Sequence, residues 1–547
     1  MISQRGAWWL LALPLLFLGL FFLYPLVSIL GTGVGQGNGF STVLSDPYYR
    51  ELFVFTAAQA VASTFFALLI GVPASYVLGE FQFRGRRAFL TMATLPFVLP
   101  AVVVAAALLA VFGQNGLISA SFIRLFGPET PPFSLQRTVT LVILAHVFYN
   151  TPVVLRIMMS HWMTRDKRAE EAARLLGAGP WTEWRRMRLP PAMPSMLSAA
   201  LLVFVFTFTS FGVVLLLGGS RMATIEVEIY RQAVGLFNLP VAAALSIVQM
   251  AFMTLLIVVF TLLDRRAAAG ARPVELRRPR FRREWLAVAV TLVGLSLLLI
   301  LPLVMLLIQS LSVPGAGLSL RGYTQLFEES RRAVISGPAA STLLQSLVIA
   351  AVAVVLAIPL GAMAALAATA GPRRWRLGFE LLVLLPMSAS AVLLGLGFVI
   401  ALDEPPLDLR TAWILLPIAH ALVAIPLVVR TLSPSLRALP PEASEAAQVL
   451  GARPRTVWRR ILLPLIAPAV TVGALFAFTM SMGEFGATLF IARPDWTTAP
   501  LAIYRLLGQA GGSNYQQSLA LSSLLLIVCG IAFVAMERLR GTTTGGF

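Results

Sequence analysis

Two stretches of this sequence closely resemble each other: RAEEAARLLGAGPWTEWRRMRLP at residues 168–190 and EASEAAQVLGARPRTVWRRILLP at residues 442–464. Each predicts a helix, a break and a second helix, because Ala, Glu, Leu and Arg favour helices and acidic residues favour the first helical turn. Gly177 and Gly451 should end the first helix, since glycine adopts the left-handed conformation that a helix terminus often requires. Such a short, exposed helix is suited to contact a partner.

The second helix of each stretch combines an aromatic residue with cations. Trp184 and Trp458 are each followed by two arginines, and this mixture suits the anionic inner surface of a membrane. We therefore expect the second helix to lie along that surface before the chain turns at Leu-Pro into an apolar stretch.

The two stretches belong to a longer internal repeat. Adding 274 to a residue number in the first copy finds its partner in the second, and the matched pairs include His146 with His420, Pro152 with Pro426, Gly177 with Gly451 and Trp184 with Trp458. Upstream the offset is 286, which pairs Gln59 with Gln345 and Pro73 with Pro359. The chain is therefore predicted to consist of two related halves, the second being twelve residues shorter in the outer loop after its third apolar stretch.

Apolar stretches recur through both halves. The chain is 58% hydrophobic and 12% charged, whereas soluble proteins are roughly 25% charged and a spanning helix needs about 20 apolar residues. The predicted spans are 7–30, 51–79, 88–113, 137–160, 195–219, 239–263, 285–312, 341–370, 376–401, 411–432, 465–491 and 517–536. We expect an all-α polytopic membrane protein of about twelve transmembrane helices, arranged as two parallel six-helix repeats.

The charge distribution predicts the orientation. If the N-terminus is inside, most of the 42 Lys and Arg residues fall on cytoplasmic segments, while the 24 acidic residues divide evenly. This bias is a topology signal, so the net charge of +18 does not indicate nucleic-acid binding. It predicts cytoplasmic termini, a first half at 1–264, a basic cytoplasmic linker at 265–284 and a second half at 285–547.

The pattern E-A-A, three residues, G and a later L-P resembles the EAA loop of permeases in ATP-binding-cassette importers. Two copies in one chain are similar to the fused permeases for thiamine or ferric iron, of the type I importer fold. The resemblance implies that the loops at 165–190 and 439–464 dock on an ATPase subunit. It assigns this coupling role to the following residues: Glu170, Glu171, Ala172, Ala173, Gly177, Glu445, Ala446, Ala447 and Gly451. Because Ser444 stands where the first half has Glu170, we expect the two helices to tolerate mutation unequally.

The same resemblance implies partners and a location. These are two copies of a cytoplasmic ATPase, a periplasmic or lipid-anchored solute-binding protein, and the bacterial cytoplasmic membrane. The chain is not expected to be an enzyme, because its only lysine, Lys167, lacks the glycines of a phosphate-binding loop. We therefore expect no catalytic residue, metal site or resident cofactor, with ATP and Mg²⁺ bound by the ATPase.

A few residues within the predicted spans are candidates for the translocation path. Polar groups at membrane depth usually face protein or a water-filled path, and the candidates are His146, His420, Ser210 and Glu484, with the neighbouring Phe211 and Phe485. The alternative for the histidines is hydrogen bonding to a neighbouring helix. For Glu484, which falls well inside the eleventh predicted span, the alternatives are a packing role or a hydrogen bond in a gate.

Two further acids, Glu226 and Glu228, are expected on a solvated face just outside the fifth predicted span. Contact with a delivered cation or with a binding protein is the alternative for both.

The solute class follows from the resemblance alone. LAHVFYN, SFGVVLLLGG and SMGEFGATLF look most like segments of thiamine permeases, and ferric iron or a thiamine precursor are the alternatives. A gradient-driven secondary transporter also has two parallel six-helix halves, but it has no need of an E-A-A-x-x-x-G helix in both.

Overall fold

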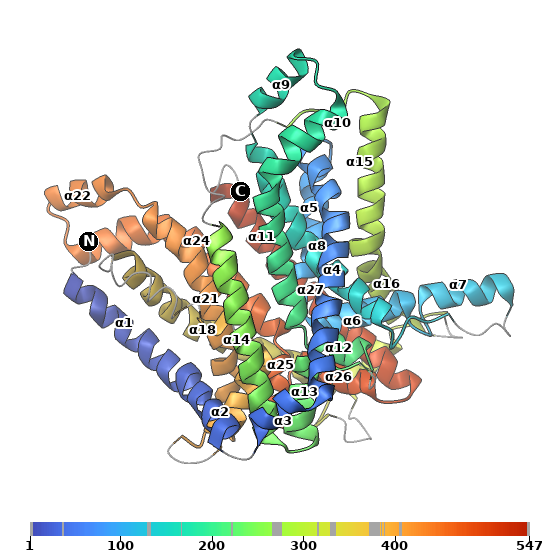
Figure 1. Ribbon diagram of the computed structural model, residues 1–547. Helices are drawn as coiled ribbons and strands as arrows, with labels where there is room; N and C mark the ends of the chain where they lie inside the picture. The colour runs from blue at the N-terminus through green and yellow to red at the C-terminus, as the bar shows by residue number, and fades with distance from the viewer. Residues whose placement is uncertain are drawn as a thin grey trace.

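The computed structural model describes residues 4–35, 38–127, 133–165, 167–219, 222–264, 276–313, 317–328, 335–370, 383, 385–387, 389–403 and 407–543. Its long helices run between two ends of the molecule (Figure 1). Eleven helical runs among these residues are long and apolar enough to cross a membrane, and α20 (Ala391–Ala401) is a shorter apolar helix. The predicted all-α polytopic fold is confirmed.

The first half comprises the elements from the N-terminus to the linker. They are α1 (Gln4–Leu18), η1 (Gly19–Leu23), α2 (Tyr24–Gly35), α3 (Gly39–Ser45), α4 (Pro47–Glu80), α5 (Arg86–Thr94), η2 (Leu95–Val98), α6 (Ala101–Phe112), α7 (Leu117–Phe126), α8 (Val139–Thr164), α9 (Lys167–Leu175), α10 (Pro180–Thr182), η3 (Glu183–Arg188), α11 (Leu189–Phe208), α12 (Gly212–Leu217), α13 (Ile225–Tyr230), η4 (Arg231–Gly235) and α14 (Leu239–Asp264).

The second half repeats this order. Its elements are α15 (Arg282–Leu295), η5 (Ser296–Ile300), α16 (Leu301–Ser310), β1 (Ser312–Val313), β2 (Gly317–Leu318), α17 (Arg321–Thr324), η6 (Gln325–Phe327), α18 (Ala339–Ala370), η7 (Leu385–Met387), α20, α21 (Leu415–Arg437), α22 (Pro441–Val449), α23 (Pro454–Val457), η8 (Trp458–Leu462), α24 (Leu463–Gly483), α25 (Gly486–Ile491), α26 (Ala499–Gly508) and α27 (Gly512–Thr543). Strands β1 and β2 form a small antiparallel hairpin.

Corresponding elements share irregularities as well as positions. The first long helix of each half contains a five-residue π-helical segment, η1 or η5. Helices α4 and α18 each enclose a proline at the matched positions Pro73 and Pro359. A proline inside a helix removes a backbone donor, so its retention in both copies fixes the same local geometry.

The helices depart from the predicted spans where the chain is interrupted. The third predicted span, 88–113, is three elements, α5, η2 and α6, because Pro96 and Pro100 break the hydrogen-bond ladder. The fifth and eleventh end early, at Phe208 and Gly483, and continue after a break as α12 and α25. The ninth, 376–401, lies partly outside the described residues, and its described part is α20.

The two halves interlock. Helix α1 packs on α18 and α2 packs on α20, while α15 packs on α4 and α16 on α6, so the opening helices of each half contact the other half. Arg156 of α8 also forms an ion pair with Glu537 of α27. One buried apolar core runs through both halves and includes Phe148 and Phe398. The halves therefore form a single packed unit.

Candidate coupling site and gate

Two short helices project from one end of the bundle, α9 in the first half and α22 in the second (Figure 1). Each follows a long helix, α8 or α21, and each contains one copy of the E-A-A sequence. Glu171 and Ala172 of α9 are exposed, as are Glu445 and Ala446 of α22, whereas Ala447 is buried and Ala173 is half-buried.

An apolar pair ends each of these helices and points into solvent. Leu175 and Leu176 are 90% and 89% exposed, and Val449 and Leu450 are both 87% exposed. Large apolar side chains this exposed, at the same place in both halves and beside an exposed acid, are typical of a surface that binds a protein partner.

The helix ends are built alike in the two halves. Gly177 and Gly451 have φ values of +83° and +78°, as predicted from the sequence. After Gly177, the Ala178 amide donates to the Ala173 carbonyl at 2.9 Å, and Ala452 and Ala447 repeat this bond at 2.9 Å. This is the Schellman arrangement, in which a left-handed residue closes the helix and satisfies its last carbonyls.

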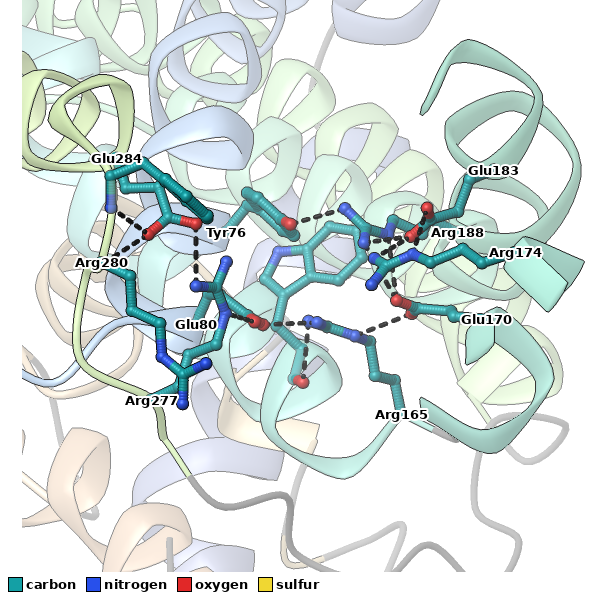
Figure 2. Close-up of polar contacts among 12 residues, drawn as sticks. Tyr76, Glu80, Arg165, Glu170, Arg174, Glu183, Arg188, Arg277, Arg280 and Glu284 are labelled. Atoms are coloured by element: carbon teal, nitrogen blue, oxygen red, sulfur yellow. Dashed lines mark hydrogen bonds and ion pairs between the residues drawn. The ribbon is translucent and has the colours of Figure 1, made fainter. Parts of the chain in front are cut away.

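A chain of alternating charges, which we call the ion chain, holds α9 in place (Figure 2). It consists of Arg277, Glu80, Arg165, Glu170, Arg188, Glu183 and Arg174, in order of contact. Glu170 lies 2.8 Å from Arg165 Nε and 3.0 Å from Arg188 Nη2. Arg165 also pairs with Glu80, and Arg188 also pairs with Glu183. Each inner charge therefore has an opposite charge on both sides.

The middle of the ion chain is buried and its ends are exposed. The side chains of Glu170 and Arg188 are 7% and 8% exposed, whereas that of Arg174 is 55% exposed. The hydrogen bond to Glu183 raises the pKa of the Arg174 guanidinium above its ordinary value, so this group stays charged. Removing one partner of a buried pair leaves the other charge uncompensated, which typically costs about 3–5 kcal/mol.

Aromatic rings close over the ion chain. Tyr76 and Trp184 lie with ring centroids 4.8 Å apart, and the Arg188 guanidinium lies 5.3 Å from the centroid of each. Trp184 therefore packs on Tyr76 and on the ion chain within the first half.

The second helix of each E-A-A stretch also differs from the expectation. Helix α10, η3 and α11 form one continuous helical run from Pro180 to Phe208, so the expected turn at Leu189-Pro190 is absent. Pro190 lies in the first turn of α11, directly after the π-helical segment η3. The second half is built in the same way, with a continuous run from Pro454 to Gly483.

Phe211 and Phe485, which are matched by the repeat, meet between the two halves. Their rings are stacked with centroids 5.8 Å apart, and the side chains are 6% and 4% exposed in the part of the chain that is described. Tyr230 lies 5.7 Å from Phe211, and Tyr504 lies 5.4 Å from Phe485, each with the rings inclined at 60°. The two breaks, one after α11 and one after α24, place these rings at the junction of the halves.

The two histidines lie in equivalent places but have different partners. His420 Nδ1 is 2.7 Å from Ser481 Oγ, and its Nε2 is 2.9 Å from Thr488 Oγ1. His146 Nδ1 is 3.2 Å from Ser63 Oγ, and its Nε2 has no hydrogen-bond partner among the described residues. The reason is that Val214 occupies the position equivalent to Thr488.

Glu484 lies at a break and not well inside a helix. Its carboxylate accepts from the Ala487 and Thr488 amides at 2.8 and 3.0 Å, and its Oε2 is 3.4 Å from His420 Nε2. It therefore caps the start of α25, where a helix N-terminus favours negative charge. Ser210 occupies the equivalent break in the first half and is half-buried.

The solvated face expected for Glu226 and Glu228 is wrong, because both are fully buried in α13. Glu228 pairs with Arg231 and accepts from Tyr48 at 2.9 Å, which joins α13 to the start of α4. Glu226 accepts from Gln249 of α14. Their polar sequence context suggested exposure, but their partners come from other helices.

Comparison with known proteins identifies the family of this chain. The family model for "Binding-protein-dependent transport system inner membrane component" matches residues 71–269 and 357–539, one match in each half. The chain belongs to this family. It is therefore a multi-pass permease subunit of a bacterial ATP-binding-cassette transporter and not an enzyme.

Relatives of similar length match over both halves of the chain. The chain is 26% identical over 522 residues to the thiamine transport system permease protein ThiP of Brucella abortus (strain 2308), covering 93% of this chain and 92% of the relative. It is 27% identical over 511 residues to the protein of the same name from Escherichia coli (strain K12), covering 91% and 90%. A crystal structure of a bacterial alginate transporter in complex with a pentasaccharide-bound periplasmic protein aligns at 17% identity with a TM-score of 0.42, covering 49% of this chain and 98% of that chain.

Sequence reasoning missed most of the ion chain. Glu80, Arg165 and the pair Glu183 and Arg188 lie on three separate segments of the first half, and only Glu170 was singled out. The repeat contained a signal for these residues, because the position in the second half that matches each charge is occupied by an uncharged residue.

Proposed function

We propose that this chain is the membrane-spanning subunit of an ATP-driven thiamine importer of the bacterial cytoplasmic membrane. Two copies of a cytoplasmic ATPase bind α9 and α22, and they supply the sites for ATP and Mg²⁺. A periplasmic or lipid-anchored protein delivers the solute to the opposite end. Both termini are cytoplasmic, in line with the ends of the chain marked in Figure 1 on the side of α9 and α22.

The observation that carries the proposal is the duplicated exposed surface on α9 and α22. Glu171 with Leu175, and Glu445 with Val449, present an acid and an apolar side chain at matched positions in the two halves. Two equivalent sites on one chain suit two identical partner subunits. Closure of an ATPase dimer would then displace both sites together and move the halves relative to each other.

Thiamine is favoured as the solute by the relatives named above, which match over both halves. Thiamine is an aromatic cation, and the cluster of Phe211, Phe485, Tyr230 and Tyr504 offers ring faces that attract cations. Glu484 already accepts hydrogen bonds from two amides and from Thr488, so we assign the attraction for a cation to the rings.

The stacked pair of Phe211 and Phe485 is proposed as the gate. Two buried rings in contact leave no room for a solute between them, and they come from opposite halves. Movement of the halves driven by the ATPase would separate the rings. His146, His420 and Ser210 are proposed to act by holding the helices around this gate.

The test is uptake of radiolabelled thiamine by proteoliposomes that contain the chain, its cognate ATPase and its binding protein. We expect accumulation that requires ATP and that is lost when Glu171→Arg and Glu445→Arg are combined, because both docking surfaces then carry the wrong charge. Ferric iron supplied with the same complex is the solute control. Iron uptake in place of thiamine would overturn the solute, and uptake without any ATPase would overturn the coupling.

A further inference from the structure

The ion chain exists in one half only. The repeat places an uncharged residue opposite each of its six members that have a counterpart: Leu366 for Glu80, Leu439 for Arg165, Ser444 for Glu170, Gln448 for Arg174, Val457 for Glu183 and Leu462 for Arg188. In the second half, Val457 is 3% exposed, and Leu366 and Leu439 pack on the main apolar core. The charged attachment of α9 therefore has no counterpart at the matched positions of the second half.

These contacts differ in how they respond to movement. Ion pairs between buried groups depend on distance and direction, and separating them exposes uncompensated charge in a medium of low dielectric constant. Apolar contacts are not directional, so side chains can slide past one another while staying buried. The ion chain therefore resists reorientation of α9 more strongly than apolar contacts alone would.

Glu170 occupies the decisive place in the ion chain. It comes from α9 itself, and its two oxygens face Arg165 at the end of α8 and Arg188 at the start of α11. Through Arg165 it reaches Glu80 at the end of α4. One side chain of the coupling helix therefore touches charges that connect it to three long helices of its half.

The ion chain also reaches the beginning of the second half. Arg277 Nε lies 2.8 Å from Glu80 Oε1, and Arg277 Nη1 lies 2.8 Å from Glu284 Oε1 in α15. The backbone adds to this link, because the Arg277 amide donates to the Glu80 carbonyl at 3.1 Å and the Gln82 amide donates to the Arg277 carbonyl at 2.8 Å. The end of the linker and the start of α15 are thereby attached to the ion chain that positions α9.

We infer that Glu170 is a positioning residue that makes α9 move as a rigid body with α4, α8, α11 and the start of α15, while α22 couples to its half through adjustable apolar contacts. The inference rests on the proposed docking of an ATPase at both helices. It deepens that proposal by assigning the two docking sites unequal mechanical roles, with the first half transmitting displacement directly.

Spin labels can test the attachment without any partner. Cys529, the only cysteine, is buried and is replaced by Ala. A nitroxide is then placed on Leu175→Cys or on Val449→Cys in the full chain in nanodiscs. Glu170→Gln should increase the mobility of the label on α9 and leave the label on α22 unchanged. Glu442→Gln, which removes an exposed acid from α22, is the control and should change neither.

Two results would overturn the inference. One is an α9 label that is as immobile in Glu170→Gln as in the parent, and the other is equal loosening of both labels, which would indicate general destabilisation. If Glu170→Gln does not fold, Arg165→Gln provides a second test, because it breaks the same connection from α8. Glu170→Asp, which keeps the charge, should restore most of the immobility.

The reconstituted importer supplies the functional readout. Glu170→Gln should lower the number of thiamine molecules transported per ATP hydrolysed by about fivefold or more, with the amount of bound ATPase unchanged. Glu51→Gln, which removes an exposed acid near the start of α4 and away from both docking helices, should leave the ratio as in the parent. An unchanged ratio in Glu170→Gln would contradict the rigid-body role. If the parent complex takes up no thiamine, the proposed solute fails, but the spin-label result still decides whether Glu170 positions α9.

Discussion

Single residues decide how α9 and α22 end and which hydrogen bonds form inside each half. Gly177 and Gly451 adopt positive φ values that cost a residue with a Cβ atom about 1 kcal/mol or more. His146 and His420 occupy matched positions, yet only His420 has protein partners on both ring nitrogens in the described structure. The repeat thus conserves residue type at these sites more closely than it conserves the contacts.

Replacing Gly177 with Ala should loosen the end of α9. The strained φ should destabilise the last turn by about 1 kcal/mol, and hydrogen exchange at the amides of residues 175–178 should be faster by roughly fivefold. Gly179→Ala is the control, because Gly179 has a negative φ and no atom within 4 Å of an added Cβ. Equal exchange in the two variants would contradict the strain argument.

Replacing His420 with Ala should destabilise the chain more than replacing His146 with Ala. Both substitutions remove the same volume, but the first also removes the contacts of His420 with Ser481, Thr488 and Glu484, so the difference should be about 1–3 kcal/mol. Unfolding of the two variants by SDS in mixed micelles would measure it. A larger loss in His146→Ala would show that the hydrogen bonds of His420 contribute little.

At the scale of elements, the breaks between helices determine which side chains meet at the junction of the halves. Helices α12 and α25 begin at Gly212 and Gly486, directly after the breaks that bring Phe211 and Phe485 together. A Cβ atom at Gly212 would lie 2.9 Å from Ala101 Cβ, and one at Gly486 would lie 2.8 Å from Ala391 Cβ. These distances are shorter than van der Waals contact, so neighbouring helices approach closely because these residues have no side chain.

Gly212→Ala and Gly486→Ala should each lower stability by about 1–3 kcal/mol, because the added methyl group forces α12 away from α6 or α25 away from α20. Gly530→Ala in α27 is the matched control. Nothing lies within 4 Å of its added Cβ, and Ala favours a helix over Gly by about 0.5–1 kcal/mol, so this variant should be as stable as the parent or more stable. Thermal unfolding in nanodiscs would compare the three, and the same sign of change in all of them would refute the packing argument.

At the scale of the whole molecule, the halves are joined by an exchange of helices and by aromatic contacts at their junction, Phe211 with Phe485 and Tyr230 with Phe490. Helices α1 and α2 pack on the second half and α15 and α16 on the first, so the halves cannot separate without losing core contacts. The contact between Phe211 and Phe485 is local by comparison. A gate at this place can open while the exchanged helices keep the molecule intact.

The substitutions Phe211→Ala and Phe485→Ala should therefore act non-additively. A stacked aromatic pair contributes about 0.5–1.5 kcal/mol beyond burial, and this amount should appear as the interaction energy of the double-mutant cycle. Preloaded proteoliposomes should also lose thiamine faster without ATP when both rings are removed. Additive effects and an unchanged leak would contradict the gate.

The sequence by itself determined the membrane fold, the duplication and the two short helices that carry the E-A-A sequence. Apolar stretches long enough to cross a bilayer need little else to form helices, because every backbone polar group must be satisfied within the segment. The helices of the E-A-A stretches could also be predicted from sequence. Their helix-forming residues, the acids of the first turn and the glycines that end them are all local signals. The conformations of Gly177 and Gly451 were predicted correctly for that reason.

Only the tertiary structure decided which side chains meet. The burial of Glu226 and Glu228, the inward packing of Trp184, the capping role of Glu484 and the ion chain around Glu170 all depend on partners from distant segments. Exposure is predicted for a charged residue from sequence because burying a charge without a partner costs free energy. The sequence does not reveal which partner the folded chain supplies. The two halves therefore share a fold that local signals specify, and they differ in buried electrostatic contacts that exist only after the helices pack.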